Sequence, residues 1–256
     1  MAKIFCVANQ KGGVGKTTTC VNLAAALPHA GQRVLLIDLD PQGNATMGSG
    51  IDKRGLQHSV YHLLVGLVDL AGVRVTSPTG GYDVLPANRD LAGAEVELVN
   101  LDQREKRLRN ALATFHDDYD FVLIDCPPSL SMLTLNGLCC ATGVIIPMQC
   151  EYYALEGLSD LVNTIKKVHA NLNQDLKIIG LLRVMFDPRV TLQQQVSAQL
   201  ESHFGDKVFR AIVPRNVRLA EAPSHGMPGV IFDKSSKGAQ AYMAFAQEMI
   251  ERAKTF

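Results

Sequence analysis

The chain has 256 residues and is 47% hydrophobic, which provides enough apolar material for the core of an α/β domain of ordinary size. Its 25 basic and 25 acidic side chains cancel, so attraction to nucleic acid or to a membrane would require a local patch. The six cysteines form no C-x-x-C pair, and no apolar run approaches the length that spans a bilayer. We therefore expect buried thiols in a cytoplasmic protein rather than a disulfide framework, a zinc site or a membrane span.

Short apolar runs rich in β-branched residues alternate with segments of helical periodicity along the chain. The runs are nearly continuous, as in strands that are covered on both faces. This order predicts one α/β domain over 1–256, a mostly parallel twisted sheet with helices on both faces. The predicted strands are 4–8, 33–40, 120–127, 143–148, 177–186 and 208–214. The predicted helices are 17–29, 103–115, 155–172, 190–203 and 236–253.

One irregular stretch interrupts this pattern, from about residue 44 to about residue 100. It is rich in glycine and has weak periodicity, which predicts loops, small helices and a short hairpin near 73–85. We see no linker in it that would divide the chain into separate domains.

The first strand leads into the glycine-rich segment NQKGGVGKTT, which opens the first helix. Such a loop offers free backbone N–H groups and a helix N-terminus to the phosphates of a nucleotide. Lys16 is predicted to contact the β- and γ-phosphates, and the Thr17 hydroxyl to bind Mg²⁺. The pattern G-x-x-x-x-G-K-[ST] fails at Gln10, so the loop is a variant of this phosphate site. The other residues assigned to the nucleotide are Lys11, Gly12, Gly13, Val14, Gly15 and Thr18.

Lys11 places a second cation at the mouth of the loop. A further positive charge beside Lys16 and a helix N-terminus is unfavourable unless an anion lies near it. From these residues alone three arrangements stay open. Lys11 contacts phosphates bound by its own chain, contacts the phosphates of a second copy placed face to face, or is solvated.

Three aspartates end two of the predicted strands, where open α/β sheets bind ligands. Buried carboxylates there require cations, so Asp38 is placed behind the shell of a magnesium ion. Asp40 would orient or activate the attacking water, with a helix or turn cap as its alternative role. Asp125 closes an apolar strand, the Walker B pattern that holds the metal directly or through water. The predicted cofactors are ATP and Mg²⁺, and the predicted reaction is ATP hydrolysis by Lys11, Lys16 and Asp40.

The segments KGGVGKTT, DLDPQGN and DCPP resemble the motifs of the ParA/MinD family of ATPases, P-loop proteins with a deviant Walker A motif. In that family the additional lysine reaches across a nucleotide-sandwich dimer to the partner's ATP, and the resemblance assigns this role to Lys11. VMFDPRVTLQQQV and IVPRNVRLAEAPSHGMP resemble the chromosomal ParA/Soj group in particular. The similarity runs from about residue 3 to the C-terminus.

This resemblance implies roles for the last third of the chain. Met185, Pro214 and Asn216 would lie beside the adenine, and Arg189 and Arg218 at a dimer surface that meets DNA. The implied function is DNA segregation: an ATP-bound dimer binds double-stranded DNA without sequence preference and becomes nucleoid-associated. Hydrolysis stimulated by a ParB-like partner then releases the dimer. The alternative for the arginines is pairing with local acids such as Asp187 and Glu221.

Two other classes of function stay open. One is a MinD-like or cargo-positioning ATPase that acts on a protein or a membrane, and the other is a small-molecule kinase. Membrane binding is not expected, because Tyr242, Phe245 and Met249 have the spacing of a core helix rather than a basic amphipathic one. An additional N-terminal helix-turn-helix is not expected either, since the first strand starts at Lys3.

Overall fold

The computed structural model describes residues 2–113, 115, 117–152 and 154–256. Within these residues one eight-stranded sheet has the order β3-β4-β2-β5-β1-β6-β7-β8. Neighbouring strands are parallel, except that β3 and β4 are antiparallel. The strands are β1 (Lys3–Val7), β2 (Val34–Asp38), β3 (Val75–Thr76), β4 (Asp83–Leu85), β5 (Phe121–Asp125), β6 (Gly143–Met148), β7 (Lys177–Phe186) and β8 (Val208–Pro214).

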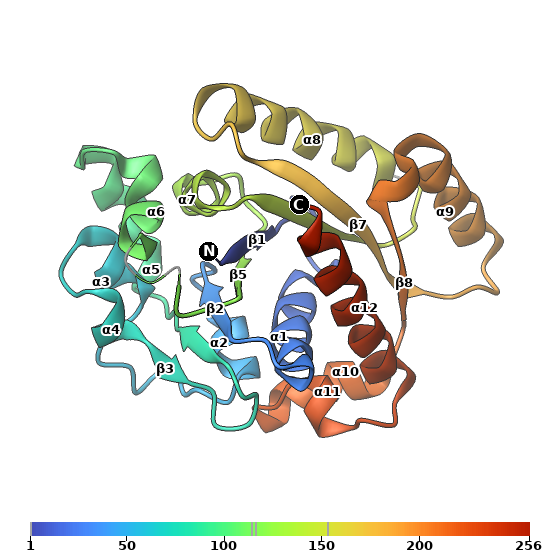
Figure 1. The fold of residues 1–256 in the computed structure, drawn as a ribbon, viewed down its shortest axis with the longest axis horizontal. Coiled ribbons are helices and arrows are strands. Elements are labelled where there is room, and N and C mark those ends of the chain that lie inside the picture. Colours follow the sequence, from blue (N-terminus) through green and yellow to red (C-terminus); the bar gives the residue numbers. More distant parts are fainter. Residues whose placement is uncertain (1, 114, 116, 153) are drawn as a thin grey trace.

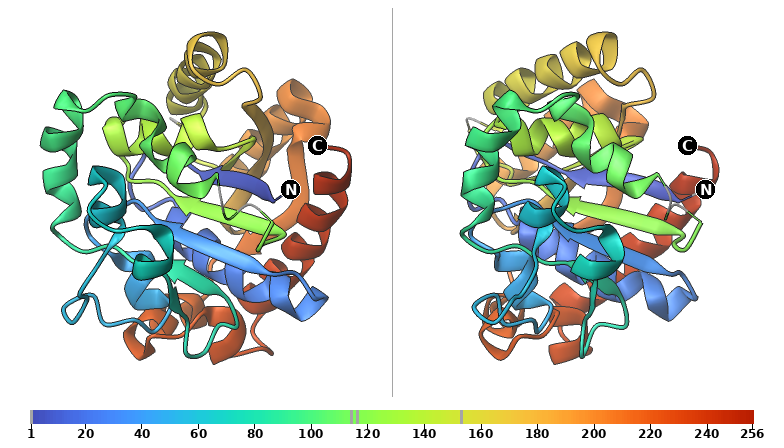
Figure 2. Two further views of the ribbon diagram at one scale, coloured as in Figure 1. Left: turned by 60° about the vertical axis from the view of Figure 1, so that its left-hand side comes forward. Right: turned by 90° about the vertical axis from the view of Figure 1, so that its left-hand side faces the viewer.

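Helices cover both faces of this sheet, with α7 and α8 on one face and α1 and α12 on the other (Figures 1 and 2). The helices up to the centre of the sheet are α1 (Lys16–Ala26), α2 (Asn44–Gly48), α3 (Val60–Val65), α4 (Leu70–Val73), α5 (Leu91–Glu97), α6 (Arg107–Leu112) and α7 (Met132–Cys140). The later ones are α8 (Ala154–Asn171), α9 (Thr191–Phe204), α10 (Val217–Glu221), α11 (Gly229–Phe232) and α12 (Lys237–Lys254). None of the described helices is long and apolar enough to cross a membrane.

Successive residues of a strand point to opposite faces and so enter two separate apolar clusters. On β5, Val122 and Ile124 join the cluster beneath α7 and α8, whereas Phe121 and Leu123 join the cluster around α1 and α12. Burial on both faces explains why the strand sequences are almost continuously apolar. The predicted α/β domain with a mostly parallel, doubly covered sheet is confirmed.

The predicted strands and helices lie within three residues of the observed ones, with two differences. The segment 103–115 contains a 3-10 turn, Arg104–Lys106, before the short helix α6. Helix α7 is absent from the prediction because it is buried around its circumference and shows no polar face to reveal its period. The irregular stretch contains the predicted hairpin, formed by β3 and β4, together with helices α2 to α5.

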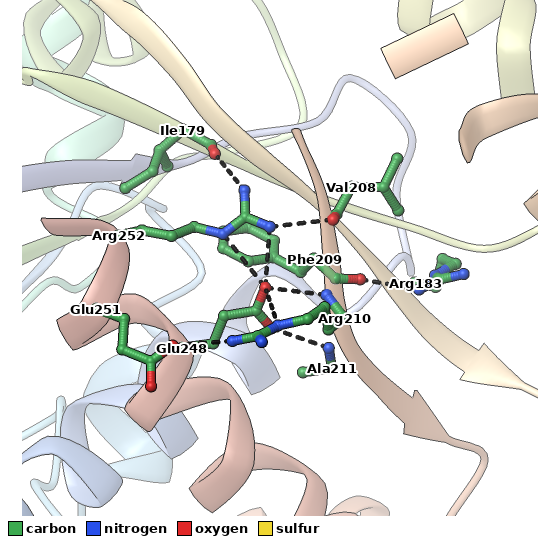
Figure 3. A network of polar contacts seen from close by, with 9 residues as sticks. All are labelled: Ile179, Arg183, Val208, Phe209, Arg210, Ala211, Glu248, Glu251 and Arg252. Carbon is green, nitrogen blue, oxygen red and sulfur yellow. Dashed lines mark hydrogen bonds and ion pairs between the residues drawn. The ribbon is translucent and has the colours of Figure 1, made fainter. Parts of the chain in front are cut away.

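Helix α12 is joined to β8 by hydrogen bonds to the buried carboxylate of Glu248 (Figure 3). Its two oxygens accept the backbone N–H groups of Arg210 and Ala211, each at 2.9 Å. Arg252 donates to Glu248 at 2.9 Å and lies 4.2 Å from the centre of the Phe209 ring. Arg252 also donates to the carbonyl oxygens of Ile179 and Val208, at the start of β7 and β8. This network therefore joins α12 to the amino edge of the sheet.

The apolar face of α12 packs in the core, since Tyr242, Phe245 and Met249 are each at most 1% exposed. The helix accordingly has the core character that its sequence predicts. Both ends of the described chain lie at the amino edge of the sheet, close to each other (Figure 2). There the ring of Phe256 lies 6.0 Å from the ring of Phe5 on β1. All six cysteines are buried free thiols, as expected.

Candidate functional site

The loop between β1 and α1 lies at the carboxyl edge of the sheet, and α1 begins at Lys16. Gly13 and Gly15 have φ angles of 73° and 78°, a left-handed conformation that side chains disfavour. A Cβ added at Gly12 or Gly13 would meet nothing within 4 Å, so this side of the loop is open to a ligand. The cavity beside it, of about 540 Å³, is lined by Thr17, Thr18, Asn44 and Lys53 among others.

Lys16 is 7% exposed, and its Nζ donates to the backbone oxygen of Lys11 at 3.0 Å. Burial lowers the pKa of Lys16, while the nearby carboxylates of Asp125 and Asp40 oppose this shift. The loop therefore holds a buried ammonium group between its own backbone and the acidic strand ends.

Asp38 and Asp125 are neighbours, because β2 and β5 pair with these two residues in register. Both side chains are fully buried. The two oxygens of Asp38 are occupied, since Oδ2 accepts from the Thr46 backbone and hydroxyl at 2.8 and 2.7 Å. Oδ1 accepts from the backbone N–H of Asp40 at 3.1 Å. Asp38 therefore organises the turn after β2, and this agrees with a place behind a metal shell.

Asp125 differs from Asp38 in that one of its carboxylate oxygens has no hydrogen-bond partner among the described residues. Its Oδ1 accepts a weak hydrogen bond from Cys20 at 3.6 Å, whereas the buried Oδ2 has no hydrogen-bond partner among the described residues. The Thr17 side chain is close enough to oppose the rise in the pKa of Asp125. Unpaired carboxylate oxygen with a neighbouring hydroxyl is the donor chemistry that Mg²⁺ prefers. These residues therefore fit a magnesium ion.

The two buried carboxyl groups predict how stability depends on pH. Burial raises the pKa of Asp38 to about 6, and burial and then the charge of Asp38 raise the pKa of Asp125 to about 8. Because the pKa values of both groups are raised in the folded state, the two groups favour folding most below pH 3.8, their ordinary pKa. This contribution to stability decreases progressively as the pH rises to about 8. We expect the melting temperature in EDTA to fall across this window, and to fall less in Asp125→Asn. If the melting temperature fell with pH by the same amount in both proteins, the raised pKa of Asp125 would be contradicted.

The turn after β2 is capped and packed. Asp40 Oδ1 accepts from the Gln42 backbone N–H at 2.9 Å, so the alternative role of Asp40 as a turn cap is present in the structure. Lys53 Nζ donates to the Gln42 carbonyl oxygen at 2.5 Å. Gly43 has φ 62°, and a Cβ there would lie 2.6 Å from the Ala87 oxygen. This turn therefore holds Asp40 at the carboxyl edge, beside Lys16.

The residues predicted beside the adenine come together at a small cavity of about 150 Å³. Met185, Pro214 and Asn216 line it, together with Gly15 and Thr18 of the loop. Met185 has a left-handed backbone with φ 53°, which is unusual for a side chain of this size. Asn216 Oδ1 caps α10 by accepting from the Leu219 N–H at 3.2 Å, which leaves the amide nitrogen of Asn216 for a ligand.

The two arginines predicted to contact DNA are exposed but paired with acids. Arg189 contacts both oxygens of Asp187, at 2.9 and 2.7 Å. Arg218 lies 2.9 Å from Glu221 and 3.4 Å from Asp233. The alternative of local ion pairs is therefore present in the structure. Because such exposed pairs contribute about 0–1 kcal/mol, they leave the arginines available for phosphate.

Lys11 adopts an arrangement that was not among the three left open by the sequence. Its Nζ forms an ion pair with Glu151 at 2.5 Å. Sequence reasoning missed Glu151, as it missed Gln149 and Lys53, because none belongs to a motif. These residues reach the site from other segments, and only the tertiary fold brings them there.

A larger cavity, of about 720 Å³, lies far from the loop, at the amino edge of the sheet. It is lined by Arg210 and Arg252 of the Glu248 network and by Arg183 of β7, which donates to the Phe209 carbonyl oxygen and pairs with Glu201 of α9. Its charged groups serve to join α12, α9 and β8, so the carboxyl edge remains the candidate site.

Comparison with known proteins agrees with this geometry. Residues 2–178 match a family model described as an AAA domain. The sporulation initiation inhibitor protein Soj of Bacillus subtilis is 51% identical over 249 residues, 97% of this chain and 98% of Soj. The chromosome partitioning protein ParA of Myxococcus xanthus is 50% identical over 252 residues, 98% of this chain and 89% of ParA.

A similar solved structure is that of cobyrinic acid a,c-diamide synthase from Mycobacterium smegmatis, with a bound ATP analog and magnesium. It is 41% identical and has a TM-score of 0.87, and the match covers 99% of this chain and 96% of that one. The matches with the partitioning proteins extend over nearly the whole chain. The chain therefore belongs to the ParA/Soj family of chromosome partitioning ATPases.

Proposed function

We propose that this protein is a Mg²⁺-dependent ATPase that segregates DNA. The observation that carries the proposal is the loop ending in buried Lys16, with Asp38 and Asp125 at the adjacent strand ends. Support comes from relatives named for chromosome partitioning and from a 41% identical structure that binds an ATP analog and magnesium.

The residues of the carboxyl edge divide the chemistry among them. The loop N–H groups and Lys16 hold the phosphates, and Thr17 and Asp125 hold the metal. Magnesium, when bound there, would neutralise part of the charge on the β- and γ-phosphates. Asp38 fixes the following turn through Thr46, and that turn presents Asp40 to the attacking water. The reaction depends on positioning and charge stabilisation, which require no covalent nucleophile.

The remaining roles concern specificity and assembly. Met185 and Pro214 pack against the adenine, and the Asn216 amide nitrogen donates to one of its ring nitrogens. ATP joins two copies of the chain in a sandwich dimer, in which Lys11 of each copy contacts the phosphates of the other. The dimer doubles the exposed arginines Arg189 and Arg218, so that a neutral monomer acquires affinity for the DNA backbone. A ParB-like partner stimulates hydrolysis and thereby releases the dimer.

DNA retention at several salt concentrations tests this function. With ATP and Mg²⁺ the wild type should bind duplex DNA of any sequence, and Arg189→Ala and Arg218→Ala should weaken binding. Each lost phosphate contact should reduce the slope of log affinity against log salt by about 0.9. Arg33→Ala is the matched control, because Arg33 forms a similar exposed pair with Asp120 at the opposite edge of the sheet.

DNA retention that changes neither on removal of the nucleotide nor on replacement of the two arginines would contradict a role in DNA segregation. Nucleotide-dependent binding to vesicles or to a protein cargo, without DNA binding, would favour the MinD-like alternative. One similar structure is named a diamide synthase. Phosphate release is therefore measured with water as the sole acceptor, and its absence would favour ATP use with a second substrate, as in a kinase.

A further inference from the structure

The end of β6 and the residues that follow it lie against the glycine loop and contact it at three points. Asn9 Nδ2 donates to the Pro147 carbonyl oxygen at 2.8 Å. Gln149 Nε2 lies 3.4 Å from the Gly13 oxygen and 2.8 Å from the sulfur of Met185. Glu151 pairs with Lys11 at 2.5 Å. The loop is therefore bounded on this side by 147–151, which carries one acidic side chain.

The ion pair occupies the group that the proposed dimer requires. Lys11 Nζ is held by a carboxylate of its own chain, so its charge is already compensated before a second copy arrives. Both side chains are about half exposed, at 49% for Lys11 and 47% for Glu151. Pairs with this exposure are weak, and a stronger anion can displace the carboxylate. The terminal phosphates of ATP carry more negative charge than one carboxylate and would compete successfully.

Glu151 is also placed so that it cannot easily follow Lys11 to a new position. The backbone before it is held by the Asn9 and Gln149 contacts, and its own carbonyl oxygen accepts from the Ala154 N–H at the start of α8. The Lys11 backbone N–H donates to Asn9 Oδ1 at 3.0 Å, which anchors the base of the lysine while its side chain stays free to turn. Movement of the lysine tip toward a second copy would therefore break the pair.

We propose that Glu151 is a positioning residue that restrains Lys11 in the free protomer and releases it when two nucleotide-loaded copies meet. The inference rests on the proposed function, since it assumes that Lys11 acts on a second copy. The restraint opposes pairing of protomers without nucleotide, where no phosphate is present to replace the carboxylate. Formation of each dimer breaks two such pairs, one in each copy, so the restraint acts twice.

The test compares wild type, Glu151→Gln and the matched control Glu156→Gln. Glu156 lies in the first turn of α8 and is exposed. It takes part in none of the ion pairs found among the described residues. The first measurement is the rate at which an acylating reagent labels Lys11 in the nucleotide-free protein, read by mass spectrometry. Labelling should rise severalfold in Glu151→Gln and stay at the wild-type rate in the control.

The second measurement is the dissociation constant of the dimer with a non-hydrolysable ATP analog and Mg²⁺, from sedimentation. Loss of two exposed pairs should lower it by roughly two- to tenfold in Glu151→Gln. The difference should shrink at high salt, because salt screens the pair in the wild type.

Unchanged labelling of Lys11 in Glu151→Gln would overturn the inference, because the carboxylate would then restrain nothing. Faster labelling with an equal or weaker dimer would overturn it as well, while the proposed function would stand. A wild type that stays monomeric with the analog would refute the proposed dimer, and the restraint would fall with it. The labelling rates distinguish this last failure from the first.

Discussion

Replacing Lys16 by alanine is expected to abolish measurable ATP hydrolysis and to weaken nucleotide binding more than any other single change in the loop. The Lys16 ammonium is buried at the start of α1 and lies near Asp125 and Asp40. Loss of one preorganised donor in such a site costs a factor of roughly 10² to 10³ in rate. Here the lost group also carries a full charge in a water-poor environment, so the loss in rate should lie at the upper end of this range. Calorimetric titration with ATP and a phosphate-release assay measure the two effects.

Lys11→Ala provides the contrast, because Lys11 belongs to the same loop but is half exposed and points to Glu151. This variant should retain ATP binding, fail to hydrolyse ATP at the normal rate and form a weaker dimer in sedimentation. Equal loss of ATP affinity in the two variants would show that both lysines act on the nucleotide of their own chain. A Lys11→Ala protein that dimerises and turns over like the wild type would refute the role across the dimer.

Replacing Glu248 by alanine is expected to cause a large loss of stability without changing the nucleotide site. Glu248 is 5% exposed and accepts two backbone N–H groups and the guanidinium of Arg252. Removing one partner of a buried pair costs about 3–5 kcal/mol. Arg252 is 21% exposed and keeps two carbonyl partners, so much of the loss comes from the two backbone N–H groups left without an acceptor, and the lower end of this range is expected. In a protein of this size the whole range corresponds to a melting temperature lower by roughly 6–20 °C. Differential scanning calorimetry measures it.

Glu251→Ala is the control for this stability effect. Glu251 lies one turn away on α12, pairs with Arg210 at 2.8 Å and is 64% exposed. Its loss should change the free energy of unfolding by less than about 1 kcal/mol. Glu248→Ala should also bind ATP with wild-type affinity, because the network lies at the edge of the sheet opposite the loop. A melting temperature within 2 °C or so of the wild type would show that water replaces the lost acceptor.

The fold was predictable because its signals are local. Continuous apolar runs indicate strands covered on both faces, and the amphipathic helices α8 and α12 show their period in the sequence. Helix α7 escaped prediction for the opposite reason, since a helix without an exposed face has no period to detect. Gly137 on α7 illustrates this, because a Cβ there would lie 3.1 Å from Cys6 and 3.2 Å from Cys126. Such packing is decided by the neighbouring strands rather than by the helix itself.

The candidate site divides in the same way. The loop, Asp38, Asp40 and Asp125 could be identified because each follows a strand and carries a recognisable motif. The sequence could also name Asp187 and Glu221 as partners of the arginines, because they are two and three residues away. It could not name Asp233 as a second partner of Arg218, nor Glu151 as the partner of Lys11, which is 140 positions away. Both contacts depend on the tertiary fold, and the second depends on the order of the strands.

The neighbouring ends of the described chain have a practical consequence. Phe256 packs on Phe5 at the edge of the sheet where the strands begin, whereas the glycine loop and the arginine-bearing loops lie where the strands finish. A fluorescent protein attached through a flexible tether at either of these ends would therefore lie on the side remote from the glycine loop. Imaging of such fusions in living cells would test the proposed DNA segregation without covering the glycine loop.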